Sequence, residues 1–387
     1  MEKAKGSRRC GPSAAGWNSL ICVLVLFFFA VPAGLALEFT DSPFVFLPGV
    51  RVWGADVTVG CLGPRLLGSV DTVLWAHVGG GWEDHKIYRD FAADGAAGTP
   101  LAADDERAGY RKLTLDWQLG LAQGLLWSTS LDHNLLEVIL QSRWRLEDYR
   151  QGAAGESSLL ASALADSGGL FMSTFLLALH LDGVQTSRRR RTSNGVDAEA
   201  SVEWAPAGLF GTPMSFIRLN AHVEGLITLA DAGNLALVAG DRLEGDIVFA
   251  GAGGLRTIPV WARTTFGGVN PYGFGGQEGL GGALRGVHNE RFDGTLKIVN
   301  NLEVRLLFPE ILPVSVFPGL IAFLDAGTSD FRALDRSPIL PDDLFISMGM
   351  GLYLHALEVD LVVCCAYCAV PSEARGLKVD FQIGTHF

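Results

Sequence analysis

The 387 residues carry 30 Lys and Arg against 42 Asp and Glu, a net charge of −12, and 49% of them are hydrophobic while only 19% are charged. This composition excludes an intrinsically disordered chain, which is rich in charge and poor in apolar residues. The acidic balance argues against a nucleic-acid partner, because such a protein needs a basic face to neutralise phosphates.

Residues 1–36 have the pattern of a secretory signal peptide. Lys3, Lys5, Arg8 and Arg9 form a basic start, and an apolar stretch and a group of small residues follow it. The alternative is an uncleaved membrane anchor, but the apolar stretch falls short of the about 20 residues that a helix needs to span a bilayer. We therefore divide the chain into a signal peptide and one further domain over 37–387, without a helical span in that domain.

The rest of the chain shows a hydrophobic period of two. Over 112–121 the odd positions are apolar and the even positions are polar or Gly, and 218–224 and 377–384 repeat the alternation. A helix would instead show apolar spacings of three and four residues. The alternation and similar apolar windows predict about fourteen strands, over 50–61, 67–80, 112–121, 134–146, 170–182, 196–205, 218–224, 234–250, 255–265, 295–307, 317–327, 346–354, 356–367 and 377–384.

Such alternation fits either a soluble sandwich or an outer-membrane β-barrel. Charged residues such as Lys112 and Glu224 lie within strands, where a wet lumen can accommodate them, and aromatic residues lie near many strand ends. These features favour the membrane barrel, and the chain length fits sixteen antiparallel strands with their connections. The high apolar content favours a narrow or plugged lumen over a wide, water-filled one.

Two local clusters have more than one interpretation. Cys364, Cys365 and Cys368 invite a metal site, but adjacent residues on a strand point to opposite faces, so we favour an apolar strand end. The basic run 188–191 is read as a solvated loop tip, with binding of lipid phosphates as the alternative. We find no catalytic constellation, and we expect no enzyme activity, cofactor or metal.

A series of motifs in the last third of the chain is more specific. It reads GGALRGV over 281–287, NLEVR over 301–305, FLDAG over 323–327, SMGMGL over 347–352 and IGTHF over 383–387. This order resembles the C-terminal barrel of the bacterial surface antigen superfamily, of BamA and TamA type, which also includes the two-partner secretion transporters. The resemblance extends from about 270 to 387, and five predicted strands follow the long loop, as in the sixteen-stranded family barrel.

The resemblance assigns roles to particular residues. Leu284, Arg285 and Gly286 would form the tip of the long sixth extracellular loop, which folds into the lumen, and Asp325 and Glu303 would be acidic partners on the inner wall. A confined guanidinium does need carboxylates placed for forked hydrogen bonds, which agrees with this assignment.

The neighbouring motif positions bear on how closely the loop approaches the wall. In the F-x-D-x-G motif, Phe323 and Gly327 share the strand face of Asp325, and the glycine leaves room for the loop. Val287 departs from the family pattern, which has Phe or Tyr there, so we expect a weaker or differently packed anchor. Unrelated loop charges and lumen acids are the alternative.

The C-terminal strand is predicted to be an assembly signal. Phe381, Ile383 and the terminal Phe387 belong to an apolar edge that must pair with the first strand, because lipid does not tolerate an open sheet edge.

Taken together, the resemblance implies a non-enzymatic, monomeric barrel of the cell outer membrane that inserts or transports proteins or lipids, or forms a pore. The residues between the signal and the first strand leave no room for a POTRA module, so activity cannot simply be carried over from the family. A passive porin or adhesin-like barrel is the alternative, and a soluble secreted all-β protein is a third. The expected partners are outer-membrane lipids and periplasmic or other outer-membrane proteins.

Overall fold

The structure is a computed structural model, and it describes most of the chain between Phe44 and Thr385. The described residues are 44–51, 54–63, 72–86, 89–91, 97–100, 109–131, 133–151, 170–187, 192–209, 214–233, 235–251, 254, 258–269, 284–287, 292–311, 316–330, 344–356, 359–370 and 376–385. The predicted signal peptide, the basic run 188–191 and Phe387 lie outside them.

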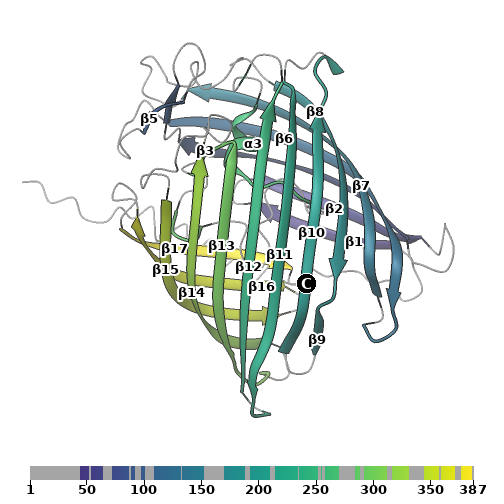
Figure 1. Cartoon of the computed structure of the whole chain (residues 1–387), viewed down its shortest axis with the longest axis vertical. Coiled ribbons are helices and arrows are strands. Elements are labelled where there is room, and N and C mark those ends of the chain that lie inside the picture. Colours follow the sequence, from purple (N-terminus) through teal and green to yellow (C-terminus); the bar gives the residue numbers. More distant parts are fainter. Residues whose placement is uncertain are drawn as a thin grey trace, which may run out of the picture.

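The strands form one large antiparallel sheet, which bends into the wall of a barrel (Figure 1). In spatial order the strands are β1 (Phe44–Arg51), β2 (Gly54–Gly63), β3 (Thr72–Lys86), β6 (Gly109–Ser128), β7 (His133–Gln151), β8 (Leu170–Asp182), β10 (Thr192–Ala205), β11 (Phe216–Asp231), β12 (Ala236–Ala250), β13 (Leu296–Leu307), β14 (Val316–Asp330), β15 (Leu344–Ala356), β16 (Val359–Val370) and β17 (Gly376–Thr385). The sheet is 15-stranded with β9 (Gln185–Ser187) as a short side branch, so fourteen strands follow one another. A separate two-stranded sheet pairs β4 (Arg89–Phe91) with β5 (Ala97–Pro100).

This topology confirms the all-β prediction, and fourteen strands follow one another in the sheet among the described residues, so the predicted count of sixteen stays a prediction. Five strands, β13 to β17, follow the long connection as the sequence predicts. Within the described part of the chain, β17 pairs with β16 and β1 with β2, and no pairing joins β1 to β17. Over the ranges given above, the sheet is therefore open between β1 and β17, and the predicted closure onto the first strand stays a prediction.

Burial follows the two-residue period and identifies the two faces of the sheet. In β11, Arg218, Asn220 and Glu224 are buried, whereas the alternating Leu219 and Val223 are exposed. The polar face is thus the inner one and the apolar face is the outer one. A soluble protein has the opposite arrangement, with its apolar face inside. An outer apolar face is typical of a barrel whose outer surface meets lipid.

One predicted strand, 255–265, is wrong. Residues 260–264 form a short helix, α3 (Val260–Thr264), that follows Pro259. Ile258, Val260, Trp261 and Ala262 are buried together, so their run is apolar without alternation. Periodicity cannot separate a short buried helix from a buried strand in such a run.

The predicted window 50–61 is also only partly right, because it runs from the end of one strand into the next. β1 ends at Arg51 and β2 begins at Gly54.

Among the described residues, no helix has the length and apolar character to cross a membrane.

Arginine substitutions on the apolar outer face can test whether this face lies in the membrane. Val223 lies midway along β11 and Leu229 lies near its end, and both side chains are exposed. In lipid vesicles, Val223→Arg should lower the free energy of unfolding by about 2–4 kcal/mol and Leu229→Arg by about 0–1 kcal/mol, because the cost of a charge depends on its depth in the bilayer. Equal effects of the two substitutions in a denaturant titration would contradict a lipid-facing β11.

Candidate functional site

The long connection between β12 and β13 lies against the inner face of the sheet. Its described parts are 251, 254, 258–269, 284–287 and 292–295. Two of these parts bind the wall through buried charges: the stretch 284–287, which contains Arg285, and the stretch 258–269, which contains α3. We call the second stretch the plug segment.

Arg285 is held by two carboxylates from adjacent strands. Its Nε and Nη2 donate to Oδ2 and Oδ1 of Asp325 on β14 at 2.8 and 2.7 Å, and its Nη1 donates to Oε2 of Glu303 on β13 at 2.7 Å. The backbone N–H of Arg285 also donates to Asp325 Oδ2 at 3.0 Å. The three side chains are almost fully buried, at 3%, 0% and 2% exposure for Arg285, Asp325 and Glu303. The structure thus brings together the residues that the resemblance placed at this anchor.

Further contacts stabilise the cation. The guanidinium lies 3.7 Å from the ring centroid of Phe323, within the range of a cation–π interaction. Burial by itself lowers the pKa of Arg285, but the hydrogen bonds and negative charges of Asp325 and Glu303 outweigh it and raise the pKa above its ordinary value. Glu303 also accepts a hydrogen bond from Arg305 Nε on the same strand. Each of the three guanidinium nitrogens of Arg285 therefore has a carboxylate partner.

Two glycines let the loop approach the wall. Gly286 has a φ of +79°, and a Cβ there would lie 2.6 Å from the Cβ of Ala366 on β16. On β14, a Cβ at Gly327 would lie 3.2 Å from side-chain atoms of both Leu284 and Phe292. At each of these two contacts one partner therefore has no side chain: the loop at Gly286 and the wall at Gly327.

The departure at Val287 is accommodated by an aromatic residue further along the loop. Val287 is buried in one cluster with Leu284, Phe292 and Phe345. The rings of Phe292 and Phe345 meet edge to face, with centroids 5.4 Å apart. Phe292 therefore supplies an aromatic contact between the loop and β15, and the expected difference in packing at Val287 from the family stays a prediction.

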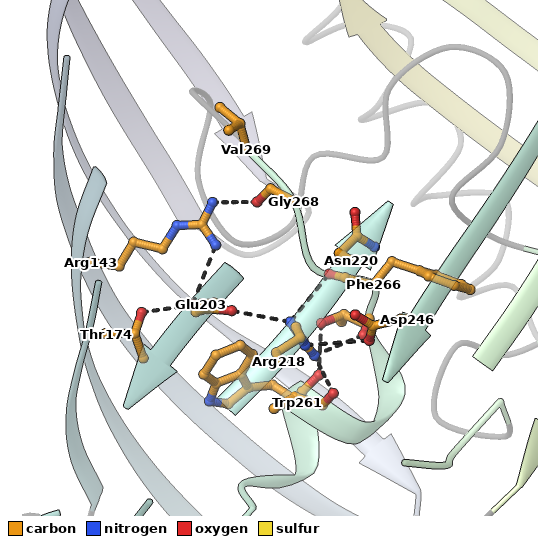
Figure 2. Close-up of polar contacts among 12 residues, drawn as sticks. Arg143, Thr174, Glu203, Arg218, Asn220, Asp246, Trp261, Phe266, Gly268 and Val269 are labelled. Atoms are coloured by element: carbon orange, nitrogen blue, oxygen red, sulfur yellow. Dashed lines mark hydrogen bonds and ion pairs between the residues drawn. The ribbon is translucent and has the colours of Figure 1, made fainter. Parts of the chain in front are cut away.

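A second set of buried charges lies on the wall beneath the plug segment (Figure 2). We call it the charge row, and its members come from β7, β10, β11, β12 and β13: Arg143, Glu203, Arg218, Asp246 and Lys297. Glu203 lies 3.5 Å from a guanidinium nitrogen of Arg143 and 3.5 Å from one of Arg218. Asp246 lies 3.3 Å from Arg218 Nε and 3.0 Å from Lys297 Nζ. Cations and carboxylates thus alternate across the wall.

The cations of the charge row bind carbonyl oxygens of the plug segment. Arg218 donates to the carbonyl oxygens of Ala262, of Thr265 at 3.0 Å and of Phe266 at 3.4 Å. Lys297 Nζ donates to the carbonyl oxygens of Ala262, at 3.2 Å, and of Thr265.

The hydrogen bonds continue along the segment after Phe266. Arg143 donates to the carbonyl oxygen of Gly268 at 2.6 Å, and Glu199 on β10 accepts from the backbone N–H of Val269 at 2.9 Å. Carbonyls at the end of a helix have no partner within the helix, so side-chain donors are required there.

Glycine again permits the contact. A Cβ at Gly267 would lie 2.6 Å from Arg218 Cδ and 2.9 Å from Asn220 Cβ, so the backbone passes directly against the wall. Gly268 has a φ of +94°. At the other end of the segment, Trp261 is buried and the guanidinium carbon of Arg218 lies 5.4 Å from its ring centroid.

The remaining predicted residues lie on β16 and β17, and of these Cys368 is buried in the same cluster as Leu284 and Val287. Phe381 and Ile383 lie in β17, opposite Val363 and Leu361 of β16. The side chains of Cys364 and Cys368 are buried and that of Cys365 is exposed, as alternation along β16 requires. Among the residues that the structure describes, no group of His, Cys, Asp and Glu is arranged to hold a metal ion.

The sequence analysis missed the charge row and the plug segment. Arg143, Glu203 and Arg218 each stand at an inward position of a predicted strand, so their direction was readable from the alternation. Which of these residues pair with one another could not be read from the alternation, because the pairing depends on the register between strands. The pair Gly267-Gly268 was the one local signal of a close backbone approach.

Comparisons with known proteins show the fold. The crystal structure of BamA from Haemophilus ducreyi lacking POTRA domains 1-3 superposes with a TM-score of 0.51 at 14% identity, over 88% of this chain and 63% of that one. This chain therefore spans less than two thirds of the length of that protein. CdiB from Acinetobacter baumannii gives a TM-score of 0.42 at 10% identity, over 89% of this chain and 57% of that one. No protein-family model and no curated protein sequence matches.

The Arg285 anchor can be tested by a double-mutant cycle. Arg285→Ala and Asp325→Ala should each release the loop, raise protease sensitivity over 270–294 and lower the free energy of unfolding by roughly 3–5 kcal/mol, because each leaves a buried charge without its partner. The double variant should be little worse than either single one. The control is Arg150→Ala, which removes an exposed ion pair with Asp148 and should have little effect. Additive effects in detergent melting would show that Arg285 and Asp325 are not partners.

The loop tip offers a second test with a closely matched control. Gly286 and Gly208 have φ of +79° and +78°, but only a Cβ at Gly286 would meet another atom within 4 Å. Gly208→Ala should cost about 1 kcal/mol of stability for the left-handed backbone alone. Gly286→Ala should cost clearly more and should loosen the loop, measured by thermal melting and limited proteolysis. Equal costs would mean that the loop tip is not pressed against β16.

Proposed function

We propose that the protein is an outer-membrane β-barrel that acts in the insertion or transport of other proteins or lipids and whose lumen is closed at rest by its own loop. The BamA-like fold and the apolar outer face support the membrane location. We further propose a closed, monomeric barrel of up to sixteen strands in the membrane, without catalytic activity. Its partners would be the surrounding lipids and periplasmic or other outer-membrane proteins.

The anchoring of Arg285 is the observation that carries this proposal. A passive porin needs a lumen whose wall charges face water. Here Asp325 and Glu303 are buried under Arg285, and Arg218 and Lys297 are bound to the plug segment. The wall therefore binds a loop of the protein itself, which suits a pathway that opens when the loop moves. A passive porin remains the second candidate, since its fold would be the same.

Electrical recording separates the two candidates. In planar bilayers the wild-type protein should show low conductance with brief openings, and Arg285→Ala should raise the open time, because it releases the loop. Arg150→Ala should behave as wild type. A steady, wide conductance of the wild type that does not change in Arg285→Ala would favour the passive porin.

Depletion of the protein from its host provides the cellular test. Loss of an insertase or transporter should lower the abundance of other outer-membrane proteins or change the lipid composition of the membrane. Complementation with the wild type should restore both, and Arg285→Ala should restore them poorly. An outer membrane of unchanged protein and lipid content after depletion would contradict the proposal.

A further inference from the structure

We propose that a polar pair on the outer face of the wall, Asp241 and Asn300, is a docking site for a membrane-embedded segment of another protein that carries an Arg or Lys within the bilayer. The inference rests on the membrane location in the proposed function and goes beyond it, because it assigns a partner to the outside of the barrel. The pair lies on the opposite face of the wall from the plug segment.

The pair lies within the apolar outer face. Asn300 on β13 donates through Nδ2 to Oδ1 of Asp241 on β12 at 2.7 Å and to the carbonyl oxygen of Arg242 at 3.2 Å. Over β12 and β13, which the structure describes in full, every other outward position is apolar or glycine: Leu237, Ala239, Leu243, Gly245, Ile247, Phe249, Leu296, Ile298, Leu302, Val304 and Leu306. The carboxylate thus interrupts a surface that otherwise suits lipid.

The depth of the pair argues against a lipid headgroup as its partner. Asp241 is five residues from Ala236, the first residue of β12, and nine from Ala250, the last. At about 3.3 Å per residue and a tilt of about 40°, the carboxylate lies roughly 13 Å from the nearer strand end, about the middle of an apolar band that is about 25 Å tall. An ionisable group at such a depth is costly, and it marks a functional contact with a compensating partner.

The charge of Asp241 defines the chemistry of the partner. Among the described residues its carboxylate accepts a hydrogen bond from Asn300 alone, so both oxygens keep capacity for further donors. The neutral amide of Asn300 does not balance the negative charge. A guanidinium or ammonium group would do so, and in good geometry the attraction would offset the desolvation of both groups. At this depth in lipid, such a cation has to be carried by a membrane-embedded segment.

Small residues beside the pair allow that segment to come close. Gly225 on β11 lies directly opposite Asp241, and Ala326 on β14 lies opposite Asn300. A Cβ at Gly225 or at Gly245 would meet no atom within 4 Å, so the outer surface is open there. Small residues on a lipid-facing surface let the backbone of a partner approach. A partner can therefore bring its cation to Asp241 from the side of β11.

The test uses the full-length barrel in phosphatidylcholine vesicles with three synthetic transmembrane helices. Each helix has about 20 Leu and Ala residues, and the three differ only in a central Arg, Leu or Glu. Association is measured by energy transfer between a dye on the helix and a dye on the barrel. The Arg helix should bind at least about tenfold more tightly than the Leu helix, and the Glu helix should bind no better than the Leu helix.

Three variants tie the binding to the carboxylate. Asp241→Asn should reduce binding of the Arg helix to the level of the Leu helix, because it removes the charge and keeps the shape. Asp231→Asn is the matched control, since Asp231 is an exposed carboxylate at the end of β11, and it should leave binding unchanged. Asp241→Leu should abolish the preference for Arg and raise the urea midpoint of unfolding in vesicles, because it removes an ionisable group from the lipid-facing side.

Several results would overturn the inference. Equal binding of the Arg and Leu helices, or tight binding of the Arg helix by Asp241→Asn, would show that the carboxylate does not attract a cation. An effect of Asp241→Asn on unfolding that appears only in phosphatidylethanolamine vesicles would make a lipid amine the partner. Cross-linked pairs of barrels that disappear in Asp241→Asn would make the partner a second copy of this chain.

Failure of this inference can be told apart from failure of the proposed function. The Arg substitutions at Val223 and Leu229 test the membrane location separately. The conductance and depletion experiments use no added helix and do not depend on Asp241.

Discussion

Charged side chains that point to the inner face of this sheet are cut off from bulk water by the loop, and each needs a partner within the protein. Stranding one charge in such a place costs several kcal/mol, whereas a forked pair with good geometry offsets its own desolvation. Arg285 meets this requirement with Asp325 and Glu303, and Arg218 meets it with Glu203, Asp246 and the loop carbonyls. The position of the loop follows from this need, because the loop brings a guanidinium to the carboxylates Asp325 and Glu303 and carbonyl oxygens to the wall cation Arg218.

The features that depend on the order of residues within one strand or motif could be predicted from the sequence. Alternation along β11 gave the strand and the direction of each side chain, and the motifs around Arg285 and Asp325 indicated their contact. It did not predict α3, because the apolar run around Val260 has no period to distinguish a helix from a strand. It also missed the charge row, since its members, from Arg143 to Lys297, are far apart in the chain and are aligned only by the register of neighbouring strands.

The aromatic packing around the anchor comes from a residue outside the predicted motif. Val287 is buried with Leu284, Phe292 and Phe345. Phe292, five residues further along the loop, packs against Phe345 and Phe266. Aromatic packing therefore has to be judged by the place of the ring in space and not by the motif position alone.

The loop between β12 and β13 connects distant strands of the wall to one another through hydrogen bonds and ion pairs. The plug segment is hydrogen-bonded to β7, β10, β11 and β13, and the stretch 284–287 to β13 and β14. Arg263 of the plug segment lies 3.5 Å from Asp293, which follows 284–287 along the same loop. These contacts connect β7 to β14 from inside the barrel and do not involve β1 or β17. We therefore expect the middle of the wall to keep its curvature whether or not the two edge strands pair.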